Sequence, residues 1–204
     1  MTTRIASLAT SATVSILMLH SALAQPAPQT HIRGTIQAIS DHSLTVLTRE
    51  GPTVTVALQD PLRVSALKRL DISAVQSGEF IGTAARRGAD GKLVALEVLV
   101  FPEAGRGTGE GHFAWDLGPD TTMTNATITS EVKATSGREL TLIYKGGTQT
   151  VMVPPDAPII SPAPAEQSDL KPGATVFFTP IRAADGSLSA ARIIVGKDGV
   201  ALPL

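Results

Sequence analysis

Hydrophobic and polar residues alternate along several short stretches of this chain. Between Val54 and Leu58 every second residue is a large aliphatic, with threonine and alanine in between. Such alternation is typical of a strand with one buried face. Comparable stretches cover residues 32–39, 44–47, 80–85 and 93–101, and the Asp90-Gly91 pair favours a hairpin turn before the last of them. We therefore expect an all-β protein.

A different pattern interrupts the strands after residue 69. The stretch 70–75 begins with a leucine and an aspartate, and Asp71 is a good N-cap for one helical turn. Gly78 follows, as glycine commonly does after a helical end. The sequence predicts a short helical turn between the third and fourth strands.

The chain resembles itself at an offset of 95 positions. Over residues 51–100 and their counterparts, 13 of 50 ungapped positions are identical, and residues 87–95 match 182–190 best. We expect two tandem copies, a first β module over 25–101 and a second over 126–204. Each copy would form a small five-stranded OB-like barrel with the helical turn between strands 3 and 4. An open five-stranded sheet, or a two-sheet sandwich spanning both copies, remains the alternative. Val56 with Val151, and Leu93 with Leu188, should all face cores.

The first 24 residues have the layout of a secretory signal peptide. Arg4 precedes a short apolar run over residues 12–19, and Ala22-Leu23-Ala24 is a small-x-small cleavage site. We expect export to a bacterial periplasm and cleavage after Ala24. An uncleaved membrane anchor is the alternative, but the apolar run is shorter than the ~20 residues that span a bilayer. No later stretch predicts a membrane span.

The connecting loop over residues 102–125 is the most unusual part of the sequence. It holds five glycines, the only tryptophan and a net charge of −3. Long loops without regular structure are usually functional or disordered, and a plain linker seldom carries large aromatic residues. We expect Phe113 and Trp115 to hold this loop between the barrels, and name Arg106, Phe113 and Trp115 as candidate binding residues.

The same loop offers a candidate metal site. Glu110, His112 and Asp116 combine an imidazole with two carboxylates, a donor set that suits a divalent transition metal such as zinc, copper or nickel. Their spacing matches no established metal motif, so in the alternative interpretation the acidic residues stay in water. The remaining histidines of the mature chain, His31 and His42, are expected to be solvated turn residues.

Composition excludes several functions. The chain of 204 residues has a formal net charge of −1, no cysteine and 3% aromatic residues. A nucleic-acid-binding protein would usually be basic or carry aromatic platforms for bases. There is no disulfide framework, and no nucleophile with a partnered base can be named, so we expect no enzyme.

Four segments carry a resemblance to a known family. They are 107–112 (GTGEGH), 115–117 (WDL), 122–125 (TMTN) and 153–158 (VPPDAP). With the tandem modules, the chain resembles a family of small exported bacterial proteins whose function is unknown. Some members are labelled metal ABC transporter permeases, although a permease needs several membrane spans. The resemblance implies the two-barrel architecture and brings no catalytic residues.

These observations favour an exported, non-enzymatic binding or scaffold protein of the periplasm, with an envelope protein as its partner. The alternative is a periplasmic metal-binding or metal-delivery protein that uses the loop 102–125.

Overall fold

The computed structural model describes residues 30–134, 137–197 and 200. Strands dominate these residues, as the alternating pattern predicts, and the only helical elements among them are short 3₁₀ turns. In chain order the elements are β1 (Ile32–Ile39), β2 (Ser43–Thr48), β3 (Thr53–Arg69), η1 (Ile72–Ala74), β4 (Phe80–Arg87), β5 (Leu93–Val100), η2 (Glu103–Gly105), β6 (Gly111–Ala114), β7 (Thr121–Ala134), β8 (Gly137–Tyr144), β9 (Gly147–Val153), β10 (Ile159–Pro164), η3 (Gln167–Asp169), β11 (Thr175–Phe178), β12 (Ile181–Arg182) and β13 (Leu188–Val195).

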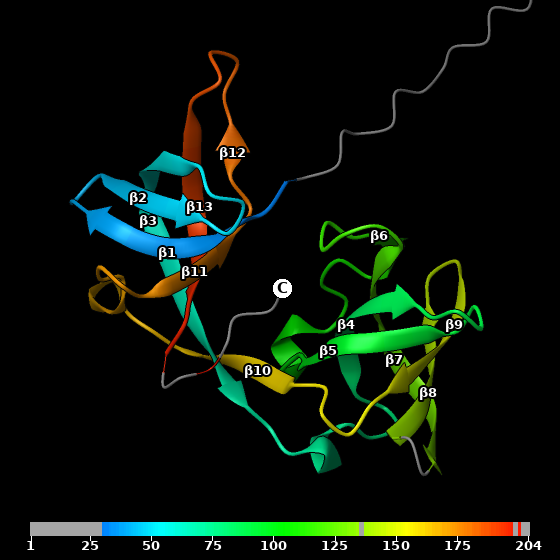
Figure 1. Cartoon of the computed structure of the whole chain (residues 1–204). Coiled ribbons are helices and arrows are strands. Elements are labelled where there is room, and N and C mark those ends of the chain that lie inside the picture. The colour runs from blue at the N-terminus through cyan, green and yellow to red at the C-terminus, as the bar shows by residue number, and fades with distance from the viewer. Residues whose placement is uncertain (1–29, 135–136, 198–199, 201–204) are drawn as a thin grey trace, which may run out of the picture.

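Two groups of strands each close into a ring of hydrogen-bonded neighbours. One ring runs β1-β2-β3-β13-β11 and back to β1, with β3 and β13 parallel. The other runs β7-β8-β9-β5-β4 and back to β7, with β5 and β9 parallel. The second ring uses residues 80–153, so we call it the nested unit. The first uses the chain on both sides of that segment and is the flanking unit (Figure 1).

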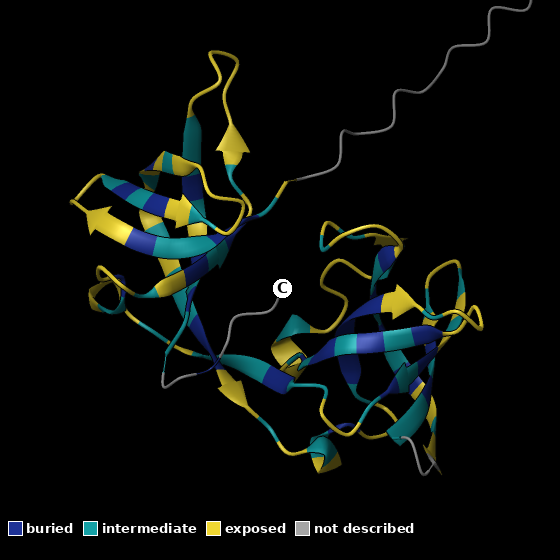
Figure 2. Ribbon diagram, viewed as in Figure 1, coloured by how far each residue is buried: buried dark blue, intermediate teal, exposed yellow. Residues whose placement is uncertain are grey.

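Each unit has a hydrophobic core of its own (Figure 2). The nested core holds Leu93 and Val151 at 2% and 0% exposure, and the flanking core holds Val56 at 0%. Leu188 is partly buried against the flanking core. The four residues predicted to face cores therefore do so, Leu188 less completely than the others.

The strand partners differ from the expectation that each sequence copy would close on itself. Strands β1 to β3, from the first predicted copy, pair with β11 and β13, from the second predicted copy. Strands β4 and β5, also from the first predicted copy, pair with β7 and β9. Both cores therefore combine residues from the two predicted modules. The sequence pattern predicts where the strands lie. It carries no information on which strands pair with each other.

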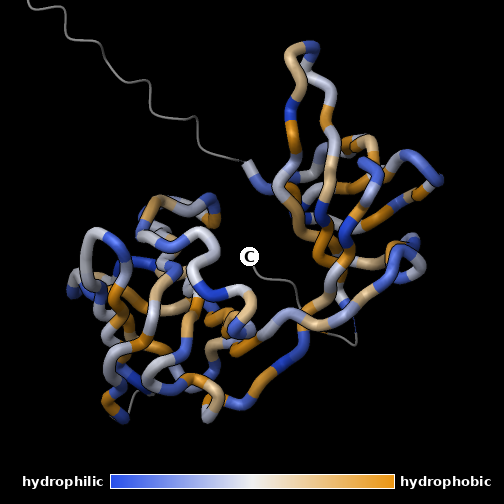
Figure 3. The backbone as a smooth tube through the Cα atoms, turned by 180° about the vertical axis from the view of Figure 1, so that it is seen from behind, coloured by the Kyte–Doolittle hydropathy of each residue, from blue (hydrophilic) through white to orange (hydrophobic). Residues whose placement is uncertain are grey.

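The registers of the two units agree at the offset of 95 positions. In the flanking unit Ala57 pairs with Ser189, and in the nested unit Met152 pairs with Val94. Between the units, the end of β3 pairs antiparallel with β10, and Leu67 lies opposite Pro162, the residue 95 positions later. Seen from behind, the two segments that carry these strands run side by side from one unit to the other (Figure 3).

The predicted helical turn is present after β3. Asp71 is its N-cap and accepts a hydrogen bond from the Ser73 amide at 2.8 Å. Gly78 follows with a φ of +94°, a conformation that glycine adopts without strain. A second 3₁₀ turn, η3, lies at the corresponding place between β10 and β11.

Within the described residues, no helix has both the length and the hydropathy needed to cross a bilayer. The predicted signal peptide over residues 1–24 lies outside the described part of the chain.

Candidate functional site

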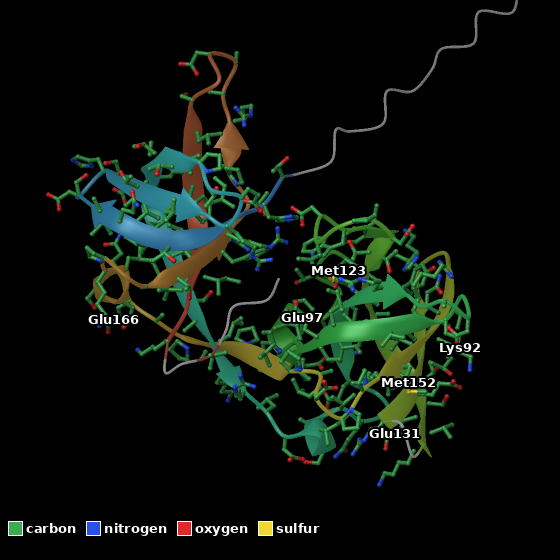
Figure 4. All side chains as sticks on the ribbon, viewed as in Figure 1. Lys92, Glu97, Met123, Glu131, Met152 and Glu166 are labelled. Carbon is green, nitrogen blue, oxygen red and sulfur yellow. The ribbon has the colours of Figure 1, made fainter. Side chains whose placement is uncertain are left out.

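A cavity of about 170 Å³ lies where the two units face each other. The flanking unit contributes residues of β3, β11 and β13, and the nested unit contributes residues of β4, β5 and β7. The segment between β5 and β7 adds three aromatic rings. The lining residues are Leu67, Gly82, Glu97, Leu99, Phe101, Phe113, Trp115, Met123, Asn125, Phe177 and Ile194. Figure 4 places Glu97 and Met123 on the side of the nested unit that faces the flanking unit.

A bulge in β5 turns Glu97 towards this cavity. Leu93 and Ala95 point into the nested core, so strict alternation would send residue 97 there as well. The pairing with β4 shifts between Ala84 and Ala85, which leaves an extra residue on β5. After the shift Val98 faces the core and Glu97 faces outward. Bulges often re-aim a side chain in this way next to binding sites.

The environment of Glu97 keeps its carboxyl group neutral. The residue is 4% exposed, and burial raises its pKa to about 8, although the charge of Arg33 acts in the opposite direction. No hydrogen bond from a described residue contributes to this shift. An acid that stays protonated at pH 7 is one of the perturbed groups that mark candidate functional sites.

A charged network lies behind two rings of the cavity wall, Trp115 and Phe177. Arg33, 5% exposed, donates from Nη2 to Asp116 Oδ1 at 2.7 Å. Asp116 Oδ2 also accepts the backbone amide of His31 at 3.0 Å and lies 2.8 Å from its Nδ1. Burial alone would raise the pKa of Asp116, but the hydrogen bonds from Arg33 and His31 outweigh it and hold that pKa well below its usual range.

Aromatic rings surround the Arg33 guanidinium. Its carbon lies 5.1 Å from the centre of the Phe177 ring and 5.7 Å from that of Trp115, within range of cation–π attraction. The Trp115 ring lies 4.3 Å from the His31 ring, centre to centre. The Arg33 Nε is buried and has no hydrogen-bond partner among the described residues. Cation–π attraction to these two rings thus helps to hold the guanidinium in place.

Of the three predicted binding residues, two line the cavity. Trp115 is half-buried, and Phe113 lies beside it with 42% exposure. Arg106 is engaged elsewhere, because its Nε and Nη2 both bind the carboxylate of Glu103 at 2.7 Å. Its Nη2 also donates to the carbonyl of Gly78. Arg106 therefore ties η2 to the nested unit.

The three predicted metal ligands lie apart, each with a protein partner of its own. Glu110 accepts the backbone amide of Lys145 at 2.9 Å. His112 Nδ1 lies 2.8 Å from the Thr124 hydroxyl, and burial lowers the pKa of its imidazole, with a smaller effect from Arg87. Asp116 belongs to the network with Arg33. In the part of the chain that the structure describes, no three His, Asp or Glu side chains form a group that could hold a metal ion.

Sequence reasoning missed the nested-unit side of the cavity. The one signal for Glu97 was its place as the only charged residue in the apolar run LVALEVLV of β5. A charged residue inside such a run indicates a special environment. Phe177 and Leu67 carried no signal, because their proximity to Glu97 depends on how the two units pack.

Comparison with known proteins yields no match: no protein-family model, curated protein or solved structure matches this chain. The family resemblance drawn from the sequence remains a prediction.

Proposed function

We propose that this chain is an exported, non-enzymatic binding protein that takes a small, largely apolar molecule into the cavity between its two units. The observation that carries the proposal is Glu97, an acid with 4% exposure in the wall of an apolar cavity. Binding sites are typically apolar hollows with a few placed polar groups. A buried carboxyl group is expensive for folding, so a role in ligand recognition explains its presence.

The size of the cavity limits the ligand. An engineered protein cavity of ~150 Å³ admits benzene. At about 170 Å³, this cavity suits a molecule with one ring and a short substituent. Among the lining residues only Glu97 titrates, so a general acid and base pair is lacking there, and binding is favoured over catalysis.

The architecture that supports this site is an internal duplication with exchanged halves. Each ring has the strand order 1-2-3-5-4 of an OB-like barrel when the exchanged strands are counted by their sequence copy. The shared offset in the parallel ladders supports a common origin of the copies. The facing outer surfaces of two such barrels then form the cavity. Export rests on the signal-peptide layout of residues 1–24, with the periplasm as destination.

The test is saturable binding of toluene, which is detected as a change in the thermal unfolding of the protein. A ligand that binds only the folded chain raises the melting temperature in proportion to ln(1 + [L]/Kd). We expect a saturable rise with the natural sequence and none with Leu99→Phe, which fills the cavity. Ile143→Phe is the matched control, because Ile143 is 49% exposed and outside the cavity. An equal rise in the Leu99 variant, or no rise at all, would contradict the proposal.

A further inference from the structure

The polar atoms at the cavity are mainly acceptors. Asn125 donates both of its amide hydrogens to loop carbonyls, from Nδ2 to Thr108 at 3.2 Å and to Gly109 at 3.1 Å. Its Oδ1 lies close to Gly82 in the cavity wall, 2.6 Å from the place where a Cβ on that glycine would be. The Glu97 carboxyl group adds two oxygens, and both accept hydrogen bonds once its proton has left. A ligand that donates hydrogen bonds therefore fits better than one that only accepts them.

The charges around the cavity favour a cation once Glu97 is ionised. Arg33 is positive, and Asp116, paired with it at 2.7 Å, is negative. Beside a neutral His31 imidazole, which lies 2.8 Å from Asp116, an ionised Glu97 leaves this cluster with one uncompensated negative charge. Arg33 is the charged group that acts on Glu97, and the other lining residues carry no titratable group. A single positive ligand group would restore neutrality beside the buried Glu97.

The aromatic lining suits the same kind of group. Phe101, Phe113, Trp115 and Phe177 all line the cavity. Ring faces attract ammonium groups, and aromatic cages recognise ammonium ligands in this way. The Phe177 and Trp115 rings already hold the Arg33 cation, and Asp116 offsets its charge.

From these three observations we infer that the ligand class is a small ring-bearing primary amine. Its ammonium group would donate to the Glu97 carboxylate and to Asn125 Oδ1, and its ring would lie against Leu99, Met123 and the aromatic residues. This inference rests on the proposed function, since it names the ligand class of the same cavity.

The experiment compares two probes of the same shape by isothermal titration calorimetry, benzylamine and benzyl alcohol. At pH 8 we expect the amine to bind at least about tenfold more tightly than the alcohol. Binding of the ammonium form requires an ionised Glu97, so below pH 8 it must expel a proton from the protein. Affinity for the amine should then rise by up to about tenfold per pH unit between pH 6 and pH 8. Titrations in buffers of different ionisation enthalpy measure the proton release directly.

The variant Glu97→Gln keeps the shape and removes the charge. We expect it to lose the preference for the amine and to keep binding of the alcohol. The matched control Glu139→Gln changes an acid of β8 outside the cavity and should behave as the natural sequence does. The pH dependence and proton release are measured on the unmodified chain, so the test survives if the Glu97 variant fails to fold.

The outcomes separate the two proposals. Equal binding of both probes without proton release would overturn the amine inference and leave the binding function in place. Tighter binding of the alcohol, with affinity falling above pH 8, would overturn it in favour of a hydrogen-bond acceptor at a protonated Glu97. Binding of neither probe, nor of toluene, would overturn both proposals.

Discussion

Arg33 and Asp116 form an ion pair of 2.7 Å that joins β1 of the flanking unit to the segment preceding β7. The Arg33 side chain is 6% exposed and that of Asp116 is 26% exposed. Removing one partner of such a pair leaves the other charge buried, without water and without a counter-charge. The pair is therefore more important for holding the units together than an exposed ion pair would be.

Asp116→Asn should destabilise the protein by roughly 2–5 kcal/mol, because the buried Arg33 keeps its charge and loses its carboxylate. Urea unfolding at pH 7 measures the change. Asp120→Asn is the control, since it removes the same charge from the same segment and Asp120 forms no salt bridge among the described residues. Equal effects of both substitutions would show that the ion pair contributes little.

Glu97 should make the protein less stable as the pH rises from about 4.5 to about 8. In this range the unfolded chain has lost the Glu97 proton, whereas the folded chain, with its pKa raised to about 8, retains it. The unfolded state binds fewer protons, so the free energy of unfolding falls, by up to about 1.4 kcal/mol per pH unit. Above pH 8 the effect levels off.

Urea unfolding at pH 5, 6, 7 and 8 measures this dependence. Glu97→Gln should flatten it, because the glutamine side chain carries no titrating proton. A variant with an unchanged slope would locate the dependence in other groups.

At low pH, Asp116 should have the opposite effect. Its pKa is held well below the unfolded value of about 3.9, so its contribution is present above that value and is lost as the pH falls below it. The difference in unfolding free energy between the natural chain and Asp116→Asn should therefore shrink between pH 5 and pH 2. A constant difference over this range would contradict the assignment of the low pKa to Asp116.

The nested unit should fold without its surroundings. All buried residues of its core lie between Val75 and Ile159, and the apolar residues packed against it begin at Leu70. We expect a fragment of residues 70–160 to unfold cooperatively in urea and to give a β-type circular dichroism spectrum. A fragment of residues 30–69 should stay unfolded, because β1 to β3 lack β11 and β13. An unfolded 70–160 fragment would contradict this division.

Trp115 should report on the cavity. It is the only tryptophan, half-buried in the cavity wall beside His31. We expect its fluorescence maximum to lie at a shorter wavelength than that of free tryptophan and to shift when toluene saturates the cavity. An emission spectrum identical to free tryptophan would place the ring in water.

Local sequence predicted the strands because alternation and turns are local properties. The alternation around Val56, the Asp90-Gly91 turn and the Asp71 cap all correspond to elements of the structure. The choice of strand partner is not local. Strand β13 carries the same inward-facing pattern as β5, so either strand could close against β3. Nothing in the pattern distinguishes the two strands.

The candidate site shows the same limit. Phe113 and Trp115 were recognised because large aromatic residues are unusual in a glycine-rich loop. The candidate metal site of Glu110, His112 and Asp116 was inferred from their donor types within one loop. In the structure His112, in β6, lies against Thr124 of β7, and Glu110 accepts the Lys145 amide instead. The orientation of the Glu97 side chain depends on a register shift between β4 and β5, and no sequence pattern marks that shift.

The nesting of one unit inside the other has a consequence for how the chain acquires its structure. The first three strands can complete their ring only with β11 and β13, so they must wait for nearly all the polypeptide to emerge. The cost of joining such distant segments grows only slowly with the length of the intervening loop. Folding of the nested unit first would reduce it further, because Leu70 and Ile159, at the two ends of that unit, are then joined by a hydrogen bond of 2.8 Å. We therefore expect a sequential assembly, in which the middle of the chain acts as the template that brings the two ends into register.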